Sequence, residues 1–187
     1  MIGAETLAGE TAADIAEHLS SVLKQEGREA EPELVHAVAR LGNGSMRDAL
    51  SLMDRLLAAG EAALTLTTLE QLLGLPDREL VGAVIDAAAD GDAGAALERA
   101  ALVLNRGVSP ELLIESLVSR LRDLMVLSAC GGETDLAELS DEARSAEASR
   151  AGRFDTAGLV HMIALCESVS RSIRQSSVPR ALLDALV

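Results

Sequence analysis

Apolar positions repeat at helical intervals along almost the whole chain. Ile15, Leu19, Val22 and Leu23, for example, follow the spacing i, i+4, i+7, i+8, which places them on one face of a helix. No segment shows a convincing alternation of apolar and polar residues, the pattern of a half-buried strand. The pattern therefore predicts an all-α fold with about ten helices.

Several helix starts carry recognisable capping residues. Thr11 followed by Asp14 resembles a capping box with Asp in place of the usual Glu, and Ser45 with Asp48 repeats the pattern. Ser109 precedes a proline, which suits the first helical position. Further helices are predicted over 77–89, 110–129 and 155–175, and another ends at about Asn105. Shorter helices are predicted to begin at Thr67 and Ser140, and a last one runs from Pro179 to the end of the chain.

A short polar link at Gly60–Leu66 is the best candidate for a domain boundary. It separates a small three-helix domain, 11–64, from a larger helical bundle, 65–187. Residues 1–10 form a separate N-terminal segment. Neither a repeat of fixed period nor a low-complexity tract is recognisable.

Composition and charge narrow the possible functions. Phe154 is the only aromatic residue, so the chain has no platform on which nucleic-acid bases could stack. The 16 Lys and Arg residues stand against 30 Asp and Glu, a formal charge of −14 that repels phosphate backbones. We therefore expect DNA to be reached only indirectly, through a larger assembly. An acidic surface that maintains solubility explains the charge more simply.

No catalytic or metal-binding constellation stands out. Gly42-Asn43-Gly44-Ser45 lacks the lysine of a phosphate-binding loop, and Cys130 and Cys166 have no metal-ligand spacing. We expect reduced thiols, no metal, no membrane span and a cytoplasmic location. A small helical enzyme using Cys166 or clustered acids has no specific support in the sequence.

The segment 42–54 is the most informative part of the chain. Its pattern predicts a tight turn followed by a helix that Ser45 caps, with Arg47 in the first turn. A cation is unfavourable at that end of a helix, whereas an anion is favoured. Arg47 could therefore be a solvent-facing residue paired with Asp or Glu, or it could contact a phosphate.

Residues 44–54, Gly-Ser-Met-Arg-Asp-Ala-Leu-Ser-Leu-Met-Asp, resemble the sensor-2 segment of the bacterial DNA polymerase III tau/gamma subunit, the motor of the sliding-clamp loader. The flanking residues 14–26 and 32–34 are similar to the small helical lid of that ATPase. Leu72-Leu73-Gly74 and the helices after it look like the start of its collar domain. The resemblance covers lid plus collar, about 11–187.

This resemblance implies roles for both domains. Arg47 would reach the γ-phosphate of ATP held in a preceding ATPase domain and couple lid position to nucleotide state. The collar would assemble with other clamp-loader subunits, with a homo-oligomer as one form. Apolar residues on the two long helices could serve the core or such an interface: Leu117, Leu121, Leu124, Val160 and Ile163.

The sequence also departs from the family pattern. It contains no P-loop, Walker-B strand or zinc-binding cysteines, residues 1–10 match nothing in the family, and Arg55 replaces the usual Gln. We therefore expect a fragment or truncated relative that is not an enzyme on its own. It would need no cofactor itself, whereas the full-length family implies ATP and Mg²⁺. The alternative is an orphan helical adaptor that keeps the fold without the loader role.

Overall fold

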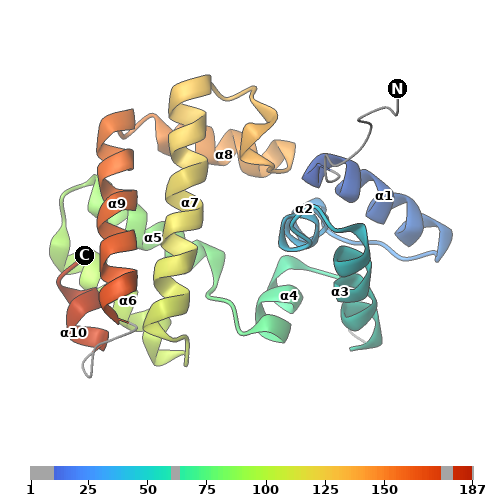
Figure 1. Cartoon of the computed structure of the whole chain (residues 1–187), viewed down its shortest axis with the longest axis horizontal. Helices are drawn as coiled ribbons and strands as arrows, with labels where there is room; N and C mark the ends of the chain where they lie inside the picture. The colour runs from blue at the N-terminus through green and yellow to red at the C-terminus, as the bar shows by residue number, and fades with distance from the viewer. Residues whose placement is uncertain (1–10, 60–63, 174–178, 187) are drawn as a thin grey trace, which may run out of the picture. The chain divides into compact units, whose positions relative to one another are not determined.

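The computed structural model describes residues 11–59, 64–173 and 179–186 (Figure 1). Within these ranges every regular element is a helix, apart from an isolated parallel bridge between Ala30 and Leu64. The all-α prediction is therefore confirmed. The predicted segment 1–10, the helix end at Gly60 and the helix end near Gln175 lie outside the described residues.

The chain forms two compact units. The N-terminal unit comprises Met1–Leu72 with Glu138–Ser140, and the C-terminal unit comprises Leu73–Ala137 with Asp141–Val187. The first contains α1 (Ala12–Gln25), α2 (Pro32–Leu41), α3 (Met46–Ala58) and all but the last residue of α4 (Leu66–Leu73). The second contains α5 (Arg78–Ala89), α6 (Ala93–Asn105), α7 (Pro110–Cys130), the 3-10 helix η1 (Asp135–Ala137), α8 (Asp141–Ala151), α9 (Thr156–Ile173) and α10 (Pro179–Asp184).

The predicted helix caps are present. The Thr11 hydroxyl accepts a hydrogen bond from the Asp14 amide, and the Asp14 carboxylate accepts one from the Thr11 amide, each at 3.1 Å. Ser45 and Ser109 accept hydrogen bonds from the amides three residues further on, at 3.3 and 3.2 Å. Each cap satisfies a backbone donor that the helix itself leaves unpaired, so local sequence sets where these helices begin.

Two predicted helix limits were wrong. α4 begins at Leu66, because the Thr65 hydroxyl, and not that of Thr67, accepts the Thr68 amide at 3.3 Å. The last helix, α10, ends at Asp184 and does not run to the end of the chain. There the amides of the next two residues still bond back to Ala181 and Leu183, as in a fraying helical turn.

Each unit has its own apolar core. Fully burying one large apolar side chain stabilises a fold by about 1.5–3 kcal/mol. The completely buried large side chains of the N-terminal unit are Ile15, Leu19, Leu34, Met53, Leu56 and Leu69. Those of the C-terminal unit are Ile85, Leu113, Ile114, Leu121, Leu124 and Leu159. Within the C-terminal unit, α7 and α9 run side by side (Figure 1), and the hydroxyls of Ser128 and Thr156 join them at 2.8 Å.

The connection between α1 and α2 is fastened to the residues before α4. The Glu31 amide donates to the Leu64 carbonyl at 3.0 Å, and the Glu31 carboxylate accepts the Leu66 amide at 2.9 Å. One residue therefore bonds to both sides of the α4 start. This clip, formed by Glu31 with Leu64 and Leu66, holds the residue before α2 against the start of α4.

Candidate functional site

The turn between α2 and α3 is compact. Gly42 ends α2, and its carbonyl accepts the Ser45 amide at 2.8 Å. Asn43 and Gly44 have φ values of 48° and 78°, in the left-handed region that reverses the chain. A Cβ on Gly42 would lie 2.9 Å from the Ala49 Cβ, so α2 and α3 approach too closely for a side chain there. The start of α3 is therefore fixed against the end of α2.

Arg47 lies in the first turn of α3 and is exposed to solvent. Its carbonyl accepts the Ser51 hydroxyl at 2.8 Å, which is an interaction within the helix. Among the described residues, its guanidinium forms no ion pair within 4.0 Å, so the expected pairing with Asp or Glu is not found there. An exposed guanidinium with no ion pair among the described residues thus lies in the helix turn that carries the positive end of the dipole.

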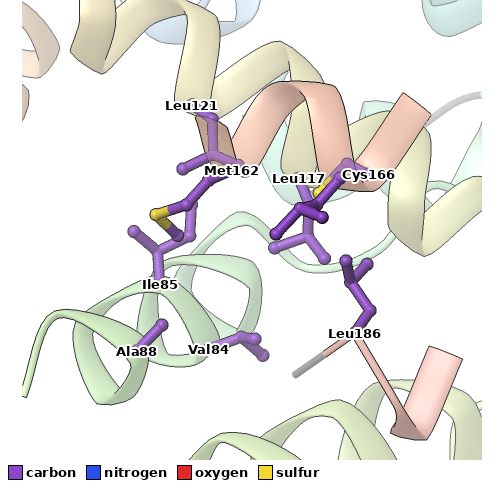
Figure 2. A pocket seen from close by; sticks show the side chains of 9 residues that line it. Val84, Ile85, Ala88, Leu117, Leu121, Met162, Cys166 and Leu186 are labelled. Atoms are coloured by element: carbon purple, nitrogen blue, oxygen red, sulfur yellow. The ribbon is translucent and has the colours of Figure 1, made fainter. Parts of the chain in front are cut away.

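A small pocket lies between the helices of the C-terminal unit (Figure 2). Its volume is about 70 Å³, well below the roughly 300–1,000 Å³ typical of small-molecule sites. Its lining is apolar apart from one thiol, and consists of Val84, Ile85, Ala88, Leu117, Leu121, Met162, Leu165, Cys166 and Leu186. No convergent polar groups are available there to orient a ligand.

The buried Cys166 thiol is poorly suited to act as a nucleophile. Burial, with a contribution from the neighbouring Glu167 charge, raises the pKa of this thiol to about 11. It therefore stays protonated near neutral pH, whereas the thiolate is the reactive form. Cys130, the other cysteine, is exposed at the end of α7.

A cluster of buried and half-buried charges in the C-terminal unit was not predicted. Arg120 on α7 and Glu147 on α8 are ion-paired, with side chains only 7% and 3% exposed. The Arg120 guanidinium also donates to the Arg78 carbonyl on α5. This guanidinium lies against the backbone of Gly82, where a Cβ would come within 2.8 Å of it. The ionic cluster, as it is called below, comprises Arg120, Glu147, Arg150, Arg153, Asp86 and Asp90.

The cluster extends to the partially exposed surface of α5. Arg150 on α8 bonds Glu147 at 3.0 Å and the two carboxylate oxygens of Asp86 at 2.9 and 3.2 Å. Arg153 bonds Asp86 at 2.6 Å and Asp90 at 2.7 Å. Burial alone would raise the pKa of Glu147, but the charges and hydrogen bonds of Arg120 and Arg150 outweigh it and lower that pKa.

One sequence signal could have revealed this cluster. Arg120 falls between Leu117 and Leu124 at intervals of three and four residues, so it occupies the apolar face of α7. A charge at such a position needs a buried partner, because an uncompensated charge in the interior is costly. The identity of that partner, 27 residues further on, does not follow from periodicity.

The described residues offer neither a metal site nor a membrane-crossing helix. No group of three or more His, Cys, Asp or Glu side chains is arranged there to hold a metal ion. No helix in the same ranges is long and apolar enough to cross a bilayer.

Comparison with protein families assigns both parts of the chain. Residues 14–62 match the ATPase lid domain of the DNA polymerase III clamp loader subunit, and residues 64–187 match domain III of the DNA polymerase III subunits gamma and tau. The chain belongs to the gamma/tau family of DNA polymerase III. Arg47 thus lies within the lid domain, and the ionic cluster lies within domain III.

Individual gamma/tau relatives agree with this assignment. A DNA polymerase III subunit gamma/tau from Mycobacterium bovis is 32% identical over 174 residues, which is 90% of this chain and 30% of that protein. A subunit tau from Escherichia coli is 31% identical over 117 residues, covering 60% of this chain and 18% of the relative. The chain therefore spans less than a third of the length of these gamma/tau relatives.

The fold is also found in solved structures. The Bacillus subtilis DNA clamp loader delta protein superposes with a TM-score of 0.53 and 13% sequence identity. The match covers 95% of this chain and 56% of that protein. At this identity the likeness concerns the fold alone.

Proposed function

We propose that the chain acts in DNA replication as the lid and collar of a clamp-loader subunit, in which Arg47 senses the γ-phosphate of ATP. ATP and Mg²⁺ would be held by an ATPase domain supplied with the lid. The observation that carries this proposal is the exposed Arg47 guanidinium, which has no ion pair among residues 11–59, 64–173 and 179–186, in the first turn of a capped helix. Helix N-termini favour anions, and a guanidinium adds a charge-assisted hydrogen bond to a phosphate oxygen.

The rigid turn before α3 makes Arg47 suitable for coupling. Because Gly42 packs closely against Ala49, a force that displaces Arg47 moves α2 and α3 together. A charge-assisted hydrogen bond contributes about 1.5–3 kcal/mol, which changes an equilibrium roughly tenfold or more. Such a contact is present with ATP and lost with ADP, so it biases lid position by nucleotide state.

The test is to introduce Arg47→Ala into a gamma/tau subunit that includes the ATPase domain joined to this chain. We expect affinity for a non-hydrolysable ATP analogue to fall about tenfold or more, while ADP affinity stays within about twofold. Titration calorimetry with both nucleotides measures this. The matched control is Arg55→Ala, an exposed arginine in the last turn of the same helix. Equal losses for both nucleotides, or no loss, would refute γ-phosphate sensing.

The C-terminal unit is proposed as the assembly surface. Leu117, Leu121 and Leu124 are buried and belong to the core, whereas Val160 is 51% exposed and Ile163 is half-buried. Leu165, also on α9, is 43% exposed. Exposed apolar side chains on one helix favour a protein partner, because their burial is stabilising.

Replacing Val160 by Glu tests this surface. We expect the variant to lose incorporation into a reconstituted clamp-loader complex by at least tenfold while its far-ultraviolet circular dichroism is unchanged, because a charge would be desolvated at the interface. Glu167→Gln, another exposed position on α9, is the control. Sedimentation velocity measures incorporation. Unchanged assembly of the Val160→Glu protein would exclude this face of α9.

A further inference from the structure

Helix α8 has almost no apolar surface with which to pack. Its sequence, DEARSAEASRA, contains no apolar side chain larger than alanine. The residues that it buries are Glu147 and Ala151. The neighbouring helices α7 and α9, by contrast, bury leucines and isoleucines in the core of the C-terminal unit. Hydrophobic burial therefore contributes little to holding α8 in place.

The side-chain bonds that join α8 to α5 and α7 are ionic. Glu147 is paired with Arg120 on α7 and lies 3.6 Å from the Arg78 guanidinium on α5. Arg150 bridges from Glu147 to Asp86 on α5. An isolated helix of 11 residues is marginal in water, so α8 depends on these contacts to remain helical.

The central pair is not fully satisfied. Within the described part of the chain, Arg120 Nε and Glu147 Oε2 are buried and have no hydrogen-bond partner. Both groups lose their hydration when α8 docks, and they regain it when α8 leaves. The free-energy difference between docked and detached α8 is consequently smaller than it is for a helix held by apolar packing.

We propose that α8 is an ionically latched element, which detaches as a unit around the Glu147–Arg120 pair while α7 and α9 remain folded. Detachment uncovers the Arg120 guanidinium beside Gly82 and so makes a further cationic group accessible to solvent. Arg153, which follows α8 and bonds Asp86 and Asp90, keeps the start of the α8–α9 connection on α5. The free segment is then bounded at its C-terminal end by this second anchor.

Hydrogen exchange of the 187-residue chain, followed by mass spectrometry at neutral pH, tests the latch. In the wild-type protein we expect amides of α8 to exchange at least tenfold faster than those in the centres of α7 and α9, because α8 opens without global unfolding. Equal protection of all three helices would overturn the proposal, since α8 would then open only with the whole unit.

Two variants separate latching from general destabilisation. Glu147→Gln should raise the amide exchange rate of α8 at least tenfold above that of the wild type, whereas the rate of α9 should stay within about threefold of its wild-type value. Glu142→Gln removes the same charge from an exposed position of α8 and should leave the exchange rates of both α8 and α9 unchanged. If Glu147→Gln does not fold, Arg150→Gln, which removes the bridge from α8 to Asp86 and leaves the Arg153 bonds in place, should produce the same selective effect at smaller size. Equal acceleration of α7, α8 and α9 in the folded variant would contradict the latch.

Discussion

Replacing Arg120 by Met lowers the free energy of unfolding of the C-terminal unit by about 3–5 kcal/mol, the loss expected when one partner of a buried ion pair is removed. The remaining Glu147 is only 3% exposed, so its carboxylate would be charged and uncompensated in the interior. The Arg78 carbonyl would lose its Arg120 donor as well. Arg150 stays within 3.0 Å of Glu147 and offsets part of this loss.

Urea unfolding monitored by circular dichroism at pH 7 measures this effect. The double variant Arg120→Met, Glu147→Leu should recover most of the loss, because neither charge of the pair remains. Arg99→Met, at an exposed position on α6, should change stability by less than about 0.5 kcal/mol. A single-variant loss below about 1 kcal/mol would mean that the pair is hydrated in solution.

The pH dependence of the difference between wild type and Arg120→Met supplies a second check. In the wild type the pKa of Glu147 lies below its usual value of 4.5, so its contribution is fully present above that value and is lost as the pH falls through the folded-state pKa. In the variant, burial without Arg120 favours the protonated carboxyl. The stability difference should therefore shrink as the pH falls below the usual glutamate value of 4.5.

Gly82→Ala should destabilise the C-terminal unit by about 2 kcal/mol or more. An alanine in a helix interior is normally favoured over glycine by about 1 kcal/mol. At Gly82, however, the new Cβ would lie 2.8–2.9 Å from three atoms of the Arg120 guanidinium. That group is held by Glu147 and the Arg78 carbonyl, so it cannot move without weakening those bonds.

Gly94→Ala provides the matched comparison for this substitution. Gly94 also lies in a helix, but its Cβ would meet only Asp92 Oδ1, at 3.4 Å. We expect this variant to be neutral or more stable by up to about 1 kcal/mol. Thermal unfolding of both proteins distinguishes the cases. A stability gain for Gly82→Ala would show that the Arg120 side chain shifts freely.

Local signals in the sequence were sufficient for much of the fold. Thr11, Ser45 and Ser109 satisfy amides only three residues away, so neighbouring residues determine the outcome. The ionic cluster could not be predicted in the same way. Its bonds join Asp86 to Arg150 across 64 residues, and the helical period gives no information about pairing over such distances.

The candidate site likewise has features that the local sequence predicts and features that it does not. The residue types of 42–54 predicted a capped helix with Arg47 in its first turn, and the structure confirms that placement. Whether Arg47 meets a phosphate depends on an ATPase domain and stays a prediction. The exposed position of Val160 and the burial of Leu121 depend on how α7 packs with α9, and both residues fit the same helical spacing.

The clip formed by Glu31 with Leu64 and Leu66 has a consequence for dissecting the protein. A recombinant lid that stopped at residue 62, where the match to the lid family ends, would lack both bonding partners of Glu31. It would also lack Leu64 and Leu69, which are 2% and 0% exposed in the intact chain. A lid fragment prepared for spectroscopy or for grafting onto an ATPase domain should therefore extend to Leu72.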